Sequence, residues 1–437
     1  MLEYLHLKNV GPAPEMELQL ASRLNLITGD NGLGKSFLLD VAWWALTRRW
    51  PQDVNSKLTS GYAARPSDPK KPVTIEFTVT TKARSRVSYE SKYVPRDESW
   101  LGKAGRPWNP GLVIYAHADG SFSVWDPARN YWKKKGNIDV QERLPGYVFS
   151  PKEVWDGLEV DVEGKATTVC NGLLRDWSNW IREGAEPSEY MTAVLRHLSP
   201  STDQCDLITP GPLTRLSVND VRDIPSLNTG YAKAVPILHA SSGVRRVVAL
   251  AYMLLWSWNE HRLAADRLGE SVTSQVVFLI DELESHLHPR WQRSILNSLL
   301  QLVSVLHAEA QTQIIAATHS PLVLASAEPS FDSKRDAWFD LDLNRTGPVG
   351  RVELRKRDFV RLGDVSNWLT SEAFDLKEAR SLEAEEAITK ALVLLKTSLP
   401  SKKEIDAVNE LLKASLSDVD RFWVRWSEFR KSRGAAK

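Results

Sequence analysis

The chain has 437 residues, enough for one large domain with additions or for two domains. Its net charge of +1 excludes a global electrostatic attraction to nucleic acid or an anionic membrane, so any basic patch must be local. Two distant cysteines, Cys170 and Cys205, favour a reducing compartment. The polar N-terminus does not resemble a signal peptide, and no apolar run could cross a bilayer, so we expect a cytoplasmic protein with no membrane partner.

The first predicted elements lead into a glycine-rich loop. Residues 2–20 alternate with period two around a Gly-Pro turn, as in a hairpin, and residues 24–28 have the composition of a short buried strand. Residues 37–49 then run apolar, as a helix packed on a sheet would. Between strand and helix lies a full match to the phosphate-loop pattern, made of Gly29, Asp30, Asn31, Gly32, Leu33, Gly34, Lys35 and Ser36.

This loop predicts that the chain binds a nucleoside triphosphate. Glycines let backbone N–H groups point at phosphates at the positive end of a helix. Lys35 can reach the β- and γ-phosphates, and the Ser36 hydroxyl can hold Mg²⁺. We therefore expect ATP and Mg²⁺ at this loop.

Residues from about 60 to 150 are predicted as a β-rich insertion. Strand-like segments occur at 73–79, 112–115 and 121–125, and Asp119-Gly120 indicates a hairpin turn between the last two. Lysines 133–135 form the only compact basic run, which we interpret as a solvated face. The 17 tryptophans of the chain mostly stand beside apolar neighbours, so we expect them in the core.

An acidic pair follows a second buried strand. Residues 276–280 are continuously apolar, as in a strand covered on both faces, and Asp281 and Glu282 come directly after them. Asp281 can orient Mg²⁺ and its waters, and Glu282 can polarise the attacking water. The pair therefore completes a candidate catalytic site together with Lys35.

Two further segments fit the same site. Ser241-Ser242-Gly243 opens a long apolar helix, and a helix start binds anions. Because the chain already has one such site, we expect Ser241 and Gly243 to face the γ-phosphate of another subunit. His319, just after the buried strand 313–317, is placed to sense that phosphate.

A nuclease centre has weaker support. Asp340 and Asp342 form a DxD pattern on the alternating segment 338–343, which we interpret as a solvated strand face. His286 and His288 lack further metal ligands nearby. From about residue 365 the pattern is helical, so we expect an ATPase head at 1–345 and a mainly helical region at 346–437.

In this order the motifs resemble those of ABC-type AAA ATPases, in the group that contains SMC proteins, RecF and the OLD-family nucleases. The similarity rests on GDNGLGKS, ASSGVRR, VVFLIDE, ESHLHP and ATHSP, and covers residues 1–60 and 235–325 best. It implies an α/β phosphate-loop sandwich whose heads pair face to face around ATP, as a homodimer or higher oligomer. It also implies that Lys35, Ser36, Asp281, Glu282 and His319 act within one head, and that Ser241 and Gly243 reach the partner's ATP.

The compact layout is similar to the ATPases of bacterial antiphage systems such as Septu, PARIS and some retrons. This resemblance implies a sensor or motor subunit that works with a separate nuclease, with DNA or a phage component as a further partner. A DNA-repair or chromosome-maintenance ATPase of the RecF and SMC type remains the alternative.

Overall fold

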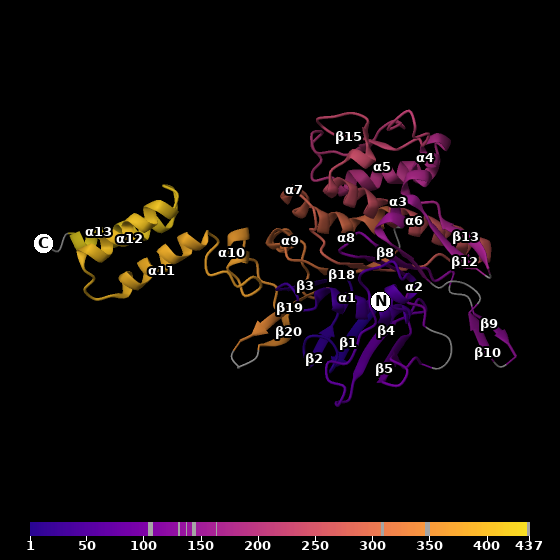
Figure 1. Cartoon of the computed structure of the whole chain (residues 1–437), viewed down its shortest axis with the longest axis horizontal. Helices are drawn as coiled ribbons and strands as arrows, with labels where there is room; N and C mark the ends of the chain where they lie inside the picture. The colour runs from indigo at the N-terminus through magenta and orange to yellow at the C-terminus, as the bar shows by residue number, and fades with distance from the viewer. Residues whose placement is uncertain are drawn as a thin grey trace. The chain divides into compact units, whose positions relative to one another are not determined.

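The computed structural model describes residues 1–103, 108–129, 132–136, 138–141, 146–162, 164–306, 310–345 and 350–434. The chain forms two compact units, Met1–Gly363 and Asp364–Lys437 (Figure 1). The larger unit contains every residue that the sequence analysis assigned to a nucleotide site.

An eight-stranded mixed sheet forms the centre of the larger unit. Its five middle strands, β7, β17, β18, β3 and β19, run parallel, and each outer strand runs antiparallel to its neighbour. Helices cover both faces of the middle strands, which explains the continuous apolar runs in the sequence. The strand order is β11 (Gly146–Phe149), β8 (Phe122–Trp125), β7 (Leu112–Ala116), β17 (Gln275–Ile280), β18 (Gln311–Ala317), β3 (Leu24–Gly29), β19 (Asp336–Asn344) and β20 (Arg351–Arg357).

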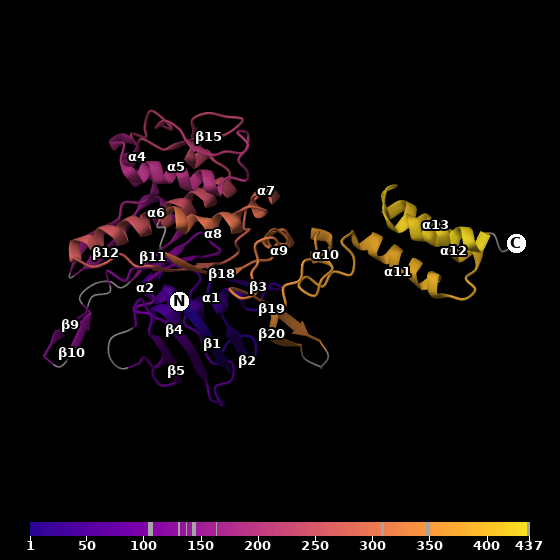
Figure 2. The same ribbon diagram turned by 180° about the vertical axis from the view of Figure 1, so that it is seen from behind.

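Helix α1 (Lys35–Thr47) packs between this sheet and a second one. Seen from either side, α6 (Ser242–Leu268) and α8 (Ile295–Leu306) lie on the opposite face of the main sheet (Figure 2). The second sheet is antiparallel and pairs in the order β2 (Glu15–Gln19), β1 (Leu2–Lys8), β4 (Thr74–Thr80), β5 (Arg86–Val94) and β6 (Ser99–Trp100).

Tryptophans fill the space between α1 and the second sheet. Trp44 stacks on Trp50 at 5.4 Å between ring centroids and meets Phe77 edge-on at 5.9 Å. Trp43 is 1% exposed and Trp100 closes the same cluster. Truncation of such a buried aromatic typically costs about 3–5 kcal/mol. The expectation that Trp43 and Trp44 are core residues is confirmed.

The segment expected as a β-rich insertion is rich in strands, but most of them belong to the two sheets of the head. Strands β4 to β6 complete the second sheet, and β7, β8 and β11 extend the main sheet beyond β17. The hairpin predicted at Asp119-Gly120 connects β7 to β8. Among the strands described in this segment, only β9 (Trp132–Lys135) and β10 (Ile138–Gln141) form a hairpin that pairs by itself. β7 pairs with a strand about 160 residues later in the sequence, and a local pattern cannot reveal such a partner.

A helical layer lies over α6 and α8. It contains α3 (Pro151–Asp156), α4 (Leu173–Glu183) and α5 (Glu186–Leu198). Between α3 and α4 the chain forms a hairpin of β12 (Leu158–Val162) and β13 (Lys165–Cys170). A small sheet of β14 (Thr209–Pro210), β15 (Ser226–Asn228) and β16 (Val235–Pro236) follows α5.

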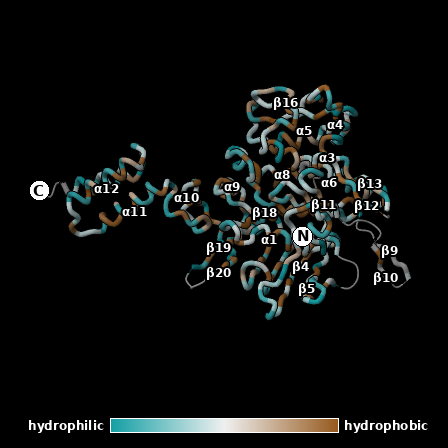
Figure 3. The backbone as a smooth tube through the Cα atoms, in the orientation of Figure 1, coloured by the Kyte–Doolittle hydropathy of each residue, from teal (hydrophilic) through white to brown (hydrophobic). Residues whose placement is uncertain are grey.

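The smaller unit is helical. It contains α10 (Val365–Leu369), α11 (Leu382–Lys396), α12 (Lys402–Ser415) and α13 (Phe422–Gly434). Hydrophobic and hydrophilic residues interleave along these helices (Figure 3), and Trp426, Leu412 and Ala391 lie in their shared core. The division between the units falls at 363/364 and not at the expected residue 345, because β20 pairs with β19 along its whole length.

Candidate functional site

The glycine-rich loop connects the end of β3 to the first turn of α1, in the predicted strand–loop–helix setting. Gly29 ends β3 with φ +136°, and Gly34 precedes α1 with φ +101°. A Cβ on Gly29 would lie 2.2 Å from the carbonyl oxygen of Leu341. Glycine is therefore required at the point where the loop passes β19. Asp30, Asn31, Gly32 and Ser36 are exposed, whereas Leu33 packs into the core.

Lys35 lies inside the curl of this loop. Its Nζ donates hydrogen bonds of 2.7 Å to the carbonyl oxygens of Gly29 and Asp30. The side chain is 5% exposed, and burial lowers the Lys35 pKa while the nearby Asp281 opposes that shift. The ammonium group is thus held at the mouth of the loop by two neutral acceptors, which phosphate oxygens could replace.

Asp281 and Glu282 lie beside the loop because β17 is separated from β3 by a single strand. Residues 280, 316 and 26 are in register across β17, β18 and β3, so the carboxyl ends of the strands meet at one edge of the sheet. Asp281 is buried and accepts a hydrogen bond from Ser36; burial raises its pKa and the Ser36 bond opposes the rise. Glu282 is half-buried and has a left-handed backbone, with φ +48°.

The donor set fits a magnesium ion. A hydroxyl and a carboxylate in direct contact are the oxygen ligands with which Mg²⁺ is bound in phosphate-loop sites, with water and phosphate oxygens in the other positions. A buried carboxylate such as that of Asp281 is unfavourable without a cation or hydrogen bonds. Among the described residues, no group of three or more His, Cys, Asp or Glu side chains is arranged to hold a metal ion.

His319 follows β18, between the phosphate loop and the acidic pair. Its ring is half-buried, and burial followed by the positive charge of Lys35 lowers its pKa. Both effects favour the neutral imidazole, and the second indicates that His319 lies within electrostatic range of Lys35. His319 thus lies at the same edge of the sheet as Lys35, Asp281 and Glu282.

The segment with Ser241 and Gly243 lies elsewhere in the head. Ser241 caps α6 by accepting a hydrogen bond of 3.4 Å from the Val244 N–H, and it is exposed. Gly243 is buried, and a Cβ there would lie 2.4 Å from the carbonyl oxygen of His286. The structure therefore packs the start of α6 on the loop that follows Glu282 and not on the phosphate loop of the same chain.

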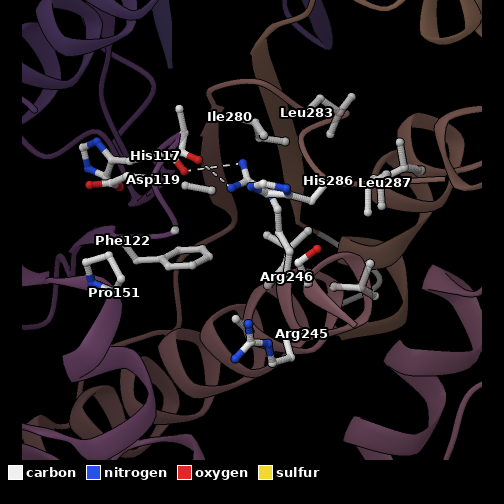
Figure 4. Close-up of a pocket in the computed structure, with 18 of the residues that line it drawn as sticks. His117, Asp119, Phe122, Pro151, Arg245, Arg246, Ile280, Leu283, His286 and Leu287 are labelled. Atoms are coloured by element: carbon white, nitrogen blue, oxygen red, sulfur yellow. Dashed lines mark hydrogen bonds between the residues drawn. The ribbon is translucent and has the colours of Figure 1, made fainter. Parts of the chain in front are cut away.

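Arg246 is a residue of this region that the sequence analysis did not assign. Its guanidinium donates to the carbonyl oxygen of Ala118 at 2.8 Å (Figure 4). It also donates to the carbonyl oxygens of Asp281 at 3.0 Å and Glu282 at 3.3 Å. It borders a cavity of about 390 Å³ between α6, the β7–β8 turn and the loop after β17. In the sequence, only the arginine pair 245–246 at the start of a helix could have indicated a residue that binds these carbonyl oxygens. The sequence does not show which of the two arginines points inward, because that depends on the packing of α6.

Asp40 is a second unassigned residue near the metal ligands. It lies one helical turn after Ser36, and its carboxylate accepts a hydrogen bond of 3.0 Å from the Tyr115 hydroxyl on β7. Burial raises its pKa to about 7. Its position four residues after Ser36 on one helix face was visible in the sequence, but its partner was not.

Asp340 and Asp342 do not form a metal centre with these groups. Asp340 is 1% exposed, accepts a hydrogen bond of 2.8 Å from Thr28 Oγ1, and pairs with Arg357 at 3.3 Å. Burial raises its pKa. The interpretation of this strand as a solvated face is wrong for Asp340, because β3 and β20 flank β19 on both sides; Asp342 is partly exposed.

In the part of the chain that the structure describes, no helix is long and apolar enough to cross a membrane.

Known proteins resemble this chain over most of its length. The curated Septu protein PtuA of Bacillus thuringiensis is 22% identical over 342 residues, which are 75% of this chain and 74% of PtuA. An SMC head bound to the C-terminal winged-helix domain of ScpA matches 81% of this chain and 97% of its own, at 11% identity and a TM-score of 0.40. A RecF structure with an ATP analogue matches 80% of this chain and 98% of its own, at 12% identity and a TM-score of 0.34.

A family model matches residues 24–325, from the strand before the phosphate loop to the helix after His319. This span includes every residue of the site described above. The chain therefore belongs to the family described as "AAA domain, putative AbiEii toxin, Type IV TA system".

Proposed function

We propose that this protein binds ATP with Mg²⁺ and hydrolyses it to ADP and phosphate. The observation that carries the proposal is the convergence of Lys35, Ser36, Asp281, Glu282 and His319 at one edge of the sheet, with the Ser36 hydroxyl on the Asp281 carboxylate. Family membership supports the same class of reaction.

Each side chain has a task in this proposal. Lys35 moves from its two carbonyl acceptors to the β- and γ-phosphates, and the loop N–H groups bind the remaining phosphate oxygens. Ser36 and Asp281 hold Mg²⁺, which neutralises charge on the phosphates. Glu282 orients and deprotonates the attacking water, and neutral His319 donates to the γ-phosphate.

The direct experiment measures ATP affinity by calorimetry and phosphate release by the purified chain, with Mg²⁺ and with EDTA. We expect ATP binding and Mg²⁺-dependent release of phosphate. If the chain binds no ATP, or if release is equal in EDTA, the proposed function is wrong.

We further propose that ATP joins two heads. Ser241 is exposed and caps a helix whose N-terminal N–H groups favour an anion, yet it does not lie on the phosphate loop of its own chain. Light scattering on Glu282→Gln, with and without ATP, tests this association. Ser241→Arg in the same background should stay at its nucleotide-free mass; if it associates on ATP as its parent does, the contact between heads is wrong.

In the cell, we propose that the ATPase acts as the sensor or motor subunit of an antiphage system and works with a separate nuclease. The similarity to Septu PtuA over three quarters of both chains supports this role. Cells carrying the gene and its neighbours should show fewer phage plaques than cells carrying Glu282→Gln. Equal plaque counts, together with DNA-damage sensitivity of a deletion strain, would favour the repair alternative.

A further inference from the structure

The loop after β17 is attached to the end of β18 by one side chain, that of Glu284. One carboxylate oxygen accepts a hydrogen bond of 2.6 Å from the Thr318 hydroxyl. The other oxygen accepts from the backbone N–H of His319. The two oxygens of the Glu284 carboxylate therefore accept hydrogen bonds from two consecutive residues, Thr318 and His319.

The backbone strengthens this attachment. The Leu283 N–H donates to the Ala317 carbonyl oxygen at 3.2 Å, so residues 283 and 284 both bind the last residues of β18 and its exit. Glu282, directly before them, has the left-handed φ of +48°. A non-glycine residue persists in that conformation only where its surroundings fix it. On the C-terminal side of Glu282, the hydrogen bonds of residues 283 and 284 hold its backbone in this conformation.

We propose that Glu284 is a positioning residue that holds His319 at a fixed distance from Glu282. This inference rests on the proposed ATP hydrolysis, in which Glu282 acts on the water and His319 on the γ-phosphate. Hydrogen bonds to an ionised carboxylate are short and strong, so the pair of bonds fixes the backbone from which the imidazole projects. Loss of Glu284 should misplace His319 relative to Glu282 while the phosphate loop, and hence ATP binding, stays intact.

The experiment compares kcat and KM for ATP in six variants of the full chain. Glu284→Ala removes both bonds, and a misplacement of this kind typically costs about 10²-fold in rate; we expect that loss in kcat with KM within about threefold. Glu284→Gln keeps one acceptor and should lose less. Thr318→Val removes only the hydroxyl bond and should lose least. Ser285→Ala alters the same loop outside both carboxylate bonds and serves as the control.

The last two variants, His319→Ala and His319→Ala/Glu284→Ala, separate positioning from general stability. In a His319→Ala background the residue to be positioned is gone, so adding Glu284→Ala should lower kcat by less than about twofold. If the two losses multiply instead, Glu284 does not act through His319 and the inference is wrong.

A second measurement does not need hydrolysis. Hydrogen exchange at the His319 amide of the nucleotide-free chain should be at least about tenfold faster in Glu284→Ala than in Ser285→Ala, because the amide loses its acceptor. Unchanged exchange would overturn the inference even in a chain that hydrolyses ATP. A parent chain that releases no phosphate but shows the faster exchange would instead overturn the proposed function alone.

Discussion

Two acidic pairs are carried by strands of the main sheet, and they differ in their position along the strand. Asp281 and Glu282 follow the last residue of β17, at the edge where the phosphate loop begins. Asp340 and Asp342 lie within β19, where Asp340 is bonded to Thr28 and Arg357. Carboxylates at the carboxyl end of a parallel strand face a ligand, whereas a carboxylate inside a strand must find its partners in the protein. Position along the strand therefore decides which pair can do chemistry.

The largest difference between the pairs should be seen in the rate of hydrolysis. Glu282→Gln keeps the shape of the side chain but loses the base, so we expect kcat to fall by about 10²–10⁴-fold with little change in ATP affinity. Phosphate release and calorimetry on the same preparation measure both quantities. A parental rate in this variant would mean that Glu282 is not the catalytic carboxylate.

Removal of the Lys35 ammonium group should affect ATP binding more than any later step. Lys35→Ala loses charged hydrogen bonds worth about 1.5–3 kcal/mol each, so ATP affinity should fall by roughly 10- to 100-fold. Calorimetry with Mg²⁺ tests this, and Lys57→Ala, an exposed lysine that pairs with Glu153, is the matched control. If Lys35→Ala binds ATP as the parent does, the loop does not hold phosphate in the way described.

Asp340 should matter for stability. Asp340→Ala removes the acceptor of the Thr28 hydroxyl and an ion-pair partner of Arg357, which should cost about 1–3 kcal/mol of the free energy of unfolding. Denaturant unfolding measures this cost against the parent. A variant as stable as the parent would show that these bonds contribute nothing net to the fold.

Asp342 should give the smallest effect. Its partly exposed position predicts a change in unfolding free energy within about 0.5 kcal/mol for Asp342→Ala. Denaturant unfolding measures this change against the parent.

We also expect the isolated chain to leave plasmid DNA uncut with Mg²⁺ or Mn²⁺ and ATP. Cutting that disappears in the Asp340→Ala/Asp342→Ala double variant would show that β19 carries a nuclease centre after all.

The comparison also shows what the sequence could predict. The phosphate loop was predictable because its strand, glycines, lysine and helix are contiguous. The acidic pair was predictable because a continuous apolar run marks a covered strand, and its end marks the sheet edge. The burial of Asp340 was not predictable, because it depends on β3, about 310 residues earlier, and on β20.

The same reasoning accounts for the strands misplaced as an insertion and for the unassigned Arg246 and Glu284. β7 inserts beside β17 through long-range pairing. Arg246 donates to backbone carbonyls about 35 residues away, and Glu284 accepts from the Thr318 hydroxyl and the His319 backbone N–H. Residue type and spacing identify groups that act on a ligand. They do not identify groups whose partner is another part of the backbone.

The measurement that tests this account most directly is the Mg²⁺ dependence of phosphate release in three chains: the parent, Asp281→Asn and Asp342→Asn. We predict that Asp281→Asn needs far more Mg²⁺ and reaches a lower rate, because a charged metal ligand is lost, while Asp342→Asn follows the parental curve. An Asp281→Asn curve identical to that of the parent, or an equal loss in Asp342→Asn, would contradict the assignment of the end of β17 as the site of ATP chemistry.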